Sequence, residues 1–151
     1  MMVIAQIEPI DPSALLHQFT AGVGEAGAVV SFTGIVRPAA DGTLVTALEL
    51  QAYPGFTEKV MAEILSEARS RFDIADAMVS HRYGTINPGE PIVFVAAASI
   101  HRREAFLAAD FLMDQFKTRA PFWKKEHGPD GMRWIEPRDQ DLRDLDRWTL
   151  E

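Results

Sequence analysis

The sequence predicts an α+β fold, and three observations carry that prediction. Some segments have helical periodicity, such as Thr57–Phe72, and others alternate with period two, such as Gly27–Arg37. In addition, two pairs of predicted strands follow each other without a helix between them, around the turns at 87–90 and 127–131. This excludes a regular alternation of strand and helix, so strands and helices are mixed instead.

The length and composition of the chain predict a single domain. Its 151 residues fall within the usual size of one domain, and a hydrophobic content of 47% is enough for a packed core. No internal repeat or linker-like stretch interrupts the chain. We therefore expect one domain over residues 1–151, with a polar C-terminal tail at about 137–151.

The first 53 residues are predicted to contain three strands and one helix. Asp11 is a suitable N-cap for the helix, and Pro12 is tolerated in its first turn. Pro38 and the Asp41-Gly42 pair predict a loop between the two longer strands. The predicted elements are a strand at Met2–Ile7, a helix from Asp11 to the glycines at 22 and 24, a strand at Gly27–Arg37 buried mainly on one face, and a strand at Leu44–Tyr53.

The rest of the chain, from Thr57 onward, is predicted to contain two helices, two strands and a hairpin. Pro121 cannot continue the second helix, so the chain must leave the helix there. The second of the two strands is apolar enough for the centre of a sheet. The predicted elements are helices at Thr57–Phe72 and Arg102–Thr118, strands at Ala77–Tyr83 and Ile92–Ala98, and an antiparallel hairpin of Phe122–Glu126 and Met132–Glu136. Leu142, Leu145 and Trp148 form a weak helical stripe in the polar tail.

The composition excludes several classes of function. The chain has no cysteine, so it offers no thiolate, and any sulfur chemistry must use sulfur brought by another molecule. A net charge of −7 opposes broad attraction to nucleic acid. The first residues lack the pattern of a signal peptide, and no apolar run approaches the roughly 18 residues that span a bilayer. We expect a cytoplasmic protein that binds neither nucleic acid nor membrane.

Basic residues gather between positions 101 and 125 of this acidic chain. His101 and Arg102 open a predicted helix, where free backbone N–H groups and the helix dipole favour an anion such as phosphate. An ordinary turn histidine beside a solvated arginine fits the same pattern equally well.

Lys117 and Lys124 are candidates for proton transfer. Lys117 borders the apolar stripe of its predicted helix, where loss of hydration would lower the pKa of its amine, although a lysine that snorkels from a helix end fits as well. Phe122, Lys124 and Glu126 share one face of the hairpin by period two. A lysine beside a glutamate suits proton transfer, but it is also an ordinary salt bridge.

Six runs of residues, in order, carry a resemblance to a known family. They are Gly27–Arg37, Tyr53–Lys59, His81–Gly84, Pro88–Glu90, His101-Arg102 and Lys117–Glu126. Together they resemble the large, catalytic subunit of molybdopterin synthase over about Gly27 to Arg138, and six ordered runs are far more specific than one short motif. The segment before Gly27 matches nothing that can be aligned, and Pro38 replaces the polar residue that many relatives carry.

The resemblance implies an α/β-hammerhead fold with an additional hairpin subdomain, and a homodimer with a small ubiquitin-like subunit at each end. That small subunit carries a C-terminal thiocarboxylate, which agrees with the absence of cysteine here. The family's catalytic lysines fall on Lys117 and Lys124. Its substrate-binding residues fall on Arg37, His101, Arg102, Lys125, Glu126 and Arg138. Neither a metal nor a cofactor is implied.

The implied activity is sulfur transfer from the carrier to cyclic pyranopterin monophosphate, which forms the dithiolene of molybdopterin. We expect Arg37, His101 and Arg102 to hold the phosphate while Lys117, assisted by Lys124, transfers protons. A homologue that binds the carrier or a pterin phosphate without catalysis is the alternative, and retention of both lysines counts against it. A phosphate-binding hydrolase is a third reading, but no metal cluster or Ser/His/Asp arrangement is evident.

Overall fold

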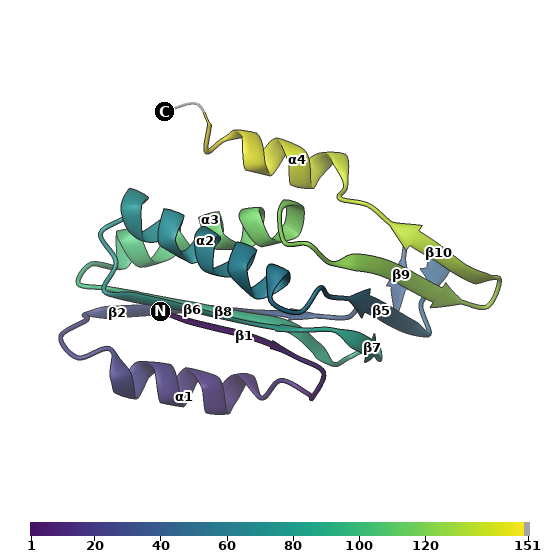
Figure 1. The fold of residues 1–151 in the computed structure, drawn as a ribbon, viewed down its shortest axis with the longest axis horizontal. Coiled ribbons are helices and arrows are strands. Elements are labelled where there is room, and N and C mark those ends of the chain that lie inside the picture. Colours follow the sequence, from purple (N-terminus) through teal and green to yellow (C-terminus); the bar gives the residue numbers. More distant parts are fainter. Residues whose placement is uncertain (150–151) are drawn as a thin grey trace.

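The computed structural model describes residues 1–149 and confirms the α+β organisation. A four-stranded sheet forms the middle layer (Figure 1). Helix α1 (Pro12–Gly22) covers one face, and helices α2 (Phe56–Arg71) and α3 (Arg102–Thr118) cover the other. A fourth helix, α4 (Asp139–Asp146), lies over α3 on the side away from the sheet. No helix within residues 1–149 is long and apolar enough to cross a membrane.

The main sheet has the strand order β1-β6-β8-β2. Its strands are β1 (Met2–Gln6), β6 (Asp76–Arg82), β8 (Pro91–Ser99) and β2 (Ala28–Ile35). Only the β1–β6 pairing is parallel among these neighbours. Strand β8 lies between two neighbours and is buried from residue 93 to residue 99, which confirms its predicted central position. Strand β2 is left at an edge.

A second sheet and a short ribbon extend from one end of the main sheet. The second sheet has the order β10-β9-β5-β7, and all of its pairings are antiparallel. The predicted hairpin forms its β9 and β10. Its strands are β10 (Gly131–Ile135), β9 (Trp123–Gly128), β5 (Ala47–Gln51) and β7 (Gly84–Ile86). The ribbon pairs β3 (Ala39–Ala40) with β4 (Thr43–Leu44).

Two short features differ from the sequence prediction. The segment predicted as a loop after Pro38 contains the β3–β4 ribbon, because Asp41 and Gly42 both adopt positive φ angles of 50° and 76° and form a tight two-residue turn. Strand β7 was not predicted, since its three residues are too short for an alternating pattern to be recognised.

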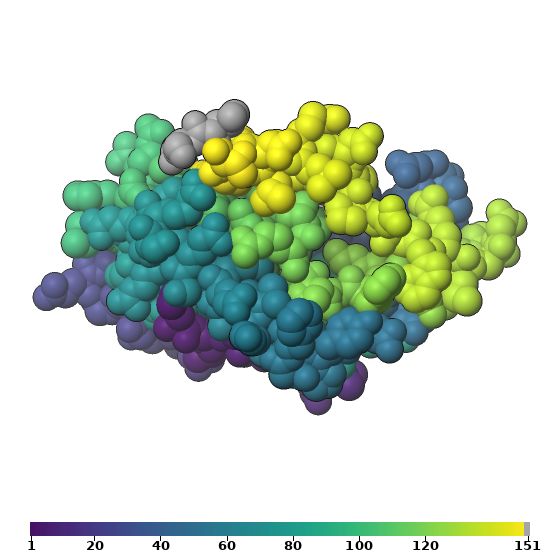
Figure 2. Space-filling view, turned by 45° about the horizontal axis from the view of Figure 1, so that its top comes forward, coloured from purple at the N-terminus to yellow at the C-terminus, as the bar shows by residue number. Residues whose placement is uncertain are grey.

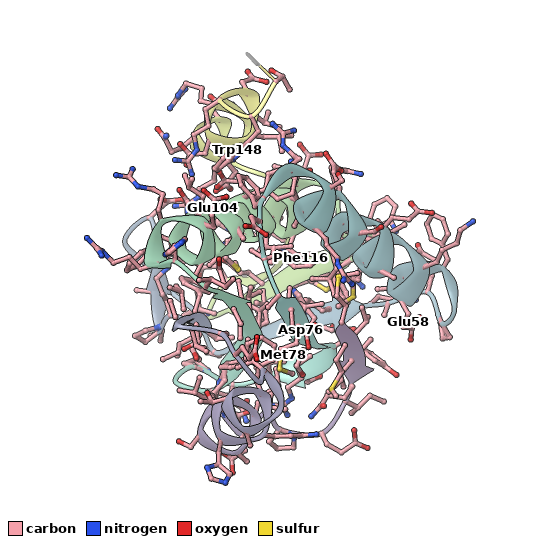
Figure 3. The ribbon with its side chains drawn as sticks, turned by 90° about the vertical axis from the view of Figure 1, so that its left-hand side faces the viewer. Glu58, Asp76, Met78, Glu104, Phe116 and Trp148 are labelled. Carbon is pink, nitrogen blue, oxygen red and sulfur yellow. The ribbon has the colours of Figure 1, made fainter. Side chains whose placement is uncertain are left out.

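The apolar core lies on both faces of the main sheet. One cluster fills the space between the sheet and helices α2 and α3, and it includes Val79 and Phe116. A smaller cluster lies beneath α1 and includes Phe19 and Met78. Phe116 and Met78 are labelled in Figure 3 and lie on opposite faces of the sheet. Met78 and Val79 follow each other in β6 and pack into different clusters, because successive side chains of a strand point to opposite faces of the sheet.

Strand β2 does not follow the predicted one-sided burial. Val29 packs against the cluster beneath α1, whereas Val30 packs against the cluster beneath α2 and α3. Further along, Phe32 and Ile35 are 43% and 56% exposed. The prediction was wrong because helices cover both faces of this edge strand at its start and cover neither face near its end.

The polar tail forms α4, and a contact that we call the clasp attaches it to α3. The indole Nε1 of Trp148 donates to Oδ2 of Asp114 at 2.6 Å, and the Arg147 guanidinium contacts Asp114 at 2.6 Å and Asp110 at 2.8 Å. The Trp148 ring also packs edge-on against Phe72 and Phe111 (5.8 and 5.4 Å between centroids), so it lies between α4 and the two helices below it (Figure 3). A helix in the tail is thereby confirmed, but the predicted stripe is confirmed only for Trp148, which packs on the core from beyond the end of α4, whereas Leu142 is 48% exposed.

Truncation of the clasp should destabilise the fold. We expect Trp148→Ala to lower the free energy of unfolding by about 2–4 kcal/mol, because it removes two aromatic contacts and leaves Asp114 short of a donor. Urea unfolding measures this loss. Leu142→Ala is the matched control on the same segment, since Leu142 is 48% exposed, and it should cost less than about 0.5 kcal/mol. Equal effects of the two substitutions would contradict the structural role of the clasp.

Candidate active site

A cavity of about 500 Å³ opens where the hairpin, the end of α3 and the start of α4 meet. In the space-filling view the yellow C-terminal segment borders a hollow beside the green hairpin (Figure 2). The charged residues that line the cavity are Arg37, Asp41, Lys117, Lys124, Glu126, Arg133, Glu136, Arg138 and Asp141. The structure thus brings together five of the predicted site residues from distant parts of the sequence.

The two lysines reach the cavity because the chain turns sharply after α3. Lys117 lies in the last turn of that helix, where the Thr118 hydroxyl donates to the carbonyl oxygen of Asp114 at 2.9 Å. Pro121 ends helical structure, and strand β9 then runs back along the cavity. Phe122, Lys124 and Glu126 all line the cavity, which confirms that they share one face.

A buried histidine lies behind the cavity wall. The His81 ring, 5% exposed, stacks on Phe122 with 4.1 Å between ring centroids and 21° between the ring planes. Its Nδ1 lies 3.0 Å from the carbonyl oxygen of Arg82, which can only accept, so Nδ1 carries the proton. Burial lowers the pKa of His81 to about 3, and the positive charges of Lys124 and Lys117 act in the same direction. The imidazole is therefore neutral at physiological pH.

Burial is also the main effect on the pKa of Lys124. With the positive charge of Lys117 acting in the same direction and Asp141 opposing both, the pKa of this amine is lowered to about 8. Lys117 itself is exposed at the surface of the cavity. The sequence analysis expected loss of hydration at Lys117, but the structure places it at Lys124 instead. An amine with a pKa near neutrality is suited to take up and release a proton.

The cavity offers several groups that favour an anion. Glu126 is held by Arg133, whose Nη2 lies 2.7 Å from Oε1, so this carboxylate is already neutralised. Arg37, Lys117 and Lys124 form no ion pair within residues 1–149. These three cations can therefore bind the negative charge of a ligand, and an arginine can hold two phosphate oxygens at once.

His101 and Arg102 do not line this cavity. They line a second pocket of about 1000 Å³ at the start of α3, together with Phe32, Ile100 and Phe106. Arg102 and Lys117 are fifteen residues apart on one helix, which separates them by roughly 22 Å along its axis. Within one chain, the structure does not bring His101 and Arg102 to the phosphate site that was expected to include Arg37.

Lys125 does not line the cavity. It points to the opposite face of β9 from Lys124, and its Nζ lies 4.4 Å from the centre of the Trp134 ring. Trp134 packs edge-on against Trp123 at 5.7 Å between centroids. The contact of Lys125 with substrate stays a prediction, and this placement gives it no support.

Several residues of this site were given no role from the sequence. His81 was noted only within a longer run, and Phe122 only as a residue on the Lys124 face of the hairpin, because nothing in a sequence shows that a strand histidine will stack behind a hairpin. Asp141 falls in the polar tail, where acidic residues are common and carry no motif.

Burial of the Lys124 amine should cost stability below pH 8. The lowered pKa means that the unfolded state binds more protons between about pH 8 and 10.5, so the free energy of unfolding rises with pH across that window. We expect Lys124→Met to be more stable than the parent by on the order of 2 kcal/mol at pH 7. The difference should shrink toward pH 10.5. Urea unfolding at several pH values measures it, and a difference independent of pH would contradict the burial of a charged amine.

Comparisons with known proteins identify the family of this chain. The model of the MoaE protein family matches residues 5–119. A relative from Caulobacter vibrioides, a molybdopterin synthase catalytic subunit by name, is 52% identical over 151 residues, covering 100% of this chain and 99% of the relative.

Two solved structures share the fold. The molybdopterin biosynthesis MoaE protein from Burkholderia ambifaria superposes with a TM-score of 0.83 at 41% identity, covering 99% of both chains. Molybdopterin synthase from Staphylococcus aureus gives a TM-score of 0.80 at 33% identity, covering 87% of this chain and 95% of that one. Because the family model spans most of the chain and these relatives match it almost end to end, the chain belongs to the MoaE protein family.

Proposed function

We propose that this chain is the catalytic subunit of a molybdopterin synthase. It transfers sulfur from the thiocarboxylated C-terminus of a small ubiquitin-like carrier to cyclic pyranopterin monophosphate, and the product is the molybdopterin dithiolene. Two sulfur atoms are needed, so two charged carriers are used in turn. The proposal treats residues 1–151 as one domain and places the protein in the cytoplasm, whose reducing conditions suit thiol chemistry.

One observation supports this proposal above the others. Lys117, Lys124 and Arg37 line a single cavity with no carboxylate paired to any of them in the described part of the chain. The chain has no cysteine, so a thiolate of its own cannot act as the nucleophile. The cavity is therefore equipped to position an anionic substrate and move protons while the nucleophilic sulfur is imported.

The geometry supports different roles for the two lysines in this proposal. Lys124, with its pKa lowered to about 8, is the proton acceptor during sulfur attack. Lys117 is exposed and supplies positive charge at the cavity mouth. This reverses the order of the sequence hypothesis, in which Lys117 led and Lys124 assisted. In this proposal Arg37 and Arg138, which line the cavity, bind the phosphate, and Glu126 and Arg133 form the adjoining wall.

His101 and Arg102 act in this proposal through a homodimer. The pocket that contains them adjoins edge strand β2, and exposed apolar side chains surround it. Phe32, Ile100 and Phe106 are 43%, 61% and 60% exposed. An unpaired strand edge beside an apolar patch suits a two-fold contact between identical chains. In such a dimer, one subunit contributes His101 and Arg102 to the cavity that contains Lys117 and Lys124 of the other.

Reconstitution tests the activity directly. The purified protein, mixed with thiocarboxylated carrier and cyclic pyranopterin monophosphate, should form molybdopterin. Lys124→Ala and Lys124→Arg should both lose on the order of 100-fold in rate, because arginine keeps the charge but cannot release a proton. Lys117→Arg should retain more activity than Lys117→Ala, since its role is electrostatic. Lys59→Ala, an exposed lysine on α2, controls for general effects.

The outcomes of reconstitution are distinct. Product formation with near-parental activity in Lys124→Arg would show that proton transfer belongs to another group. No product from a parent protein that still binds the carrier would favour the non-catalytic homologue.

Mixing two inactive variants tests the shared site. Lys117→Ala and Arg102→Ala should each be weakly active alone. Co-expressed, they form mixed dimers in which one of the two cavities receives only parental residues, so about a quarter of the parental activity should return. Sedimentation measured in parallel establishes the oligomeric state. Failure to recover activity in proven mixed dimers would mean that Lys117 and Arg102 do not serve one site.

A further inference from the structure

The cavity contains a carboxylate that the proposed function leaves without a role, that of Asp141. It belongs to the first turn of α4, and its side chain is 15% exposed. Its Oδ2 accepts a hydrogen bond of 2.9 Å from the backbone N–H of Arg138 and lies 3.7 Å from the Nε of the same residue. Asp141 therefore caps its own helix while it lines the cavity beside Lys124.

The other carboxylates of the cavity are less suited to act on Lys124. Glu126 is bound to the Arg133 guanidinium by contacts of 2.7 and 2.9 Å, which occupy its Oε1. Asp41 and Glu136 are exposed to solvent, where water screens their charge. Asp141 combines partial burial with only a long contact to a cation, so its negative charge remains available to the amine.

Two attachments fix the position of Asp141. On its N-terminal side, the chain enters α4 directly from β10 through the cavity-lining residues 135–138. On its C-terminal side, the clasp binds Arg147 and Trp148 to Asp114. Asp114 lies one helical turn before Lys117 in α3. The helix that contains Asp141 is thereby fastened to the helix that contains Lys117.

We propose that Asp141 is a positioning residue of the sulfur-transfer site, with its carboxylate directed from α4 toward the Lys124 amine so that the amine stays oriented in the cavity. This inference rests on the proposed role of Lys124. The charge of Asp141 also raises the pKa of Lys124, whereas burial and the charge of Lys117 lower it. The three effects together give a pKa of about 8. Asp141 thus raises the pH at which the amine loses its proton.

The charged and titratable groups around Lys124 come from every neighbouring element. They are Arg37 and Asp41 after β2, neutral His81 on β6, Lys117 on α3, Glu126 on β9, Arg133 on β10, and Glu136, Arg138 and Asp141 at the start of α4. Of these, Lys117 and Asp141 act on the Lys124 pKa in opposite directions. Removing the Asp141 charge leaves the effect of Lys117 unopposed.

Titration of the lysine side chains by NMR, without substrate, tests the inference. In protein labelled at the lysine side chains, Lys124→Arg identifies the Lys124 signal. Asp141→Asn should lower the apparent pKa of Lys124 on the order of half a unit, because the amide keeps an oxygen for the helix cap but loses the charge. Asp139→Asn is the matched control, since Asp139 is exposed in the same helical turn and does not line the cavity.

A third variant separates charge from helix structure. Asp141→Glu keeps the charge and should leave the Lys124 pKa close to the parental value. Equal shifts in Asp141→Asn and Asp141→Glu, or a shift in Asp141→Asn no larger than in Asp139→Asn, would overturn the inference.

Different results would contradict the inference and the proposed function. The titration needs no carrier or pterin, so a parent protein that forms no molybdopterin would still report the effect of Asp141 on the Lys124 pKa. In an active enzyme, the pH at which turnover rises should move down in Asp141→Asn by the same amount as the titration. An unmoved pH profile beside a moved titration would show that Asp141 acts on the amine but not on the reaction.

Discussion

The packing of helix α3 across the main sheet is the contact on which the rest of this molecule depends. Its buried side is almost continuous, with Ala105, Ala108, Phe111, Leu112 and Phe116 all at most 3% exposed. That apolar face fixes the rotation of the helix about its axis, and with it the direction in which the side chains at both ends point. Arg102 is presented at one end and Lys117 at the other. A helix of this length separates its two ends by roughly 22 Å along the axis, so the shared site that we propose requires a second subunit.

The cavity combines two effects that act against each other on one amine. Burial and a neighbouring lysine favour the neutral form of Lys124, whereas a carboxylate favours the charged form. Full burial without the carboxylate would lower the pKa so far that the amine would be neutral at physiological pH. Full exposure would leave an ordinary lysine, which is protonated there. The arrangement keeps the amine close to the point where both forms are populated. The fold tolerates the cost of burying it because the core beneath the main helices is extensive.

Periodicity in the sequence predicts those elements whose residues act locally. The bounds of α3 were predicted to the residue, since Arg102 follows a buried strand and Pro121 forbids continuation. The shared face of Phe122, Lys124 and Glu126 followed from the period of a strand alone. Features that depend on distant segments were not predictable in this way. Loss of hydration was assigned to Lys117 from its helical stripe, but the exposure of a helix end depends on what packs over it. The stacking of His81 on Phe122 and the approach of Asp141 to the cavity join segments far apart in the sequence, and neither leaves a local pattern.

The three tryptophans give intrinsic fluorescence signals from two separate parts of the protein, the clasp and the hairpin beside the cavity. Trp148 reports on the clasp, where the nearby Asp114 carboxylate and Arg147 guanidinium form its polar surroundings. Trp123 and Trp134 form a pair on the hairpin, and Trp134 also borders the cavity. Their emission therefore has two physically separate sources, one sensitive to attachment of the C-terminal helix and one to events beside the reactive amine. With Trp148 replaced by phenylalanine, the remaining signal comes from the hairpin alone, and occupancy of the cavity can be followed in real time without any added dye.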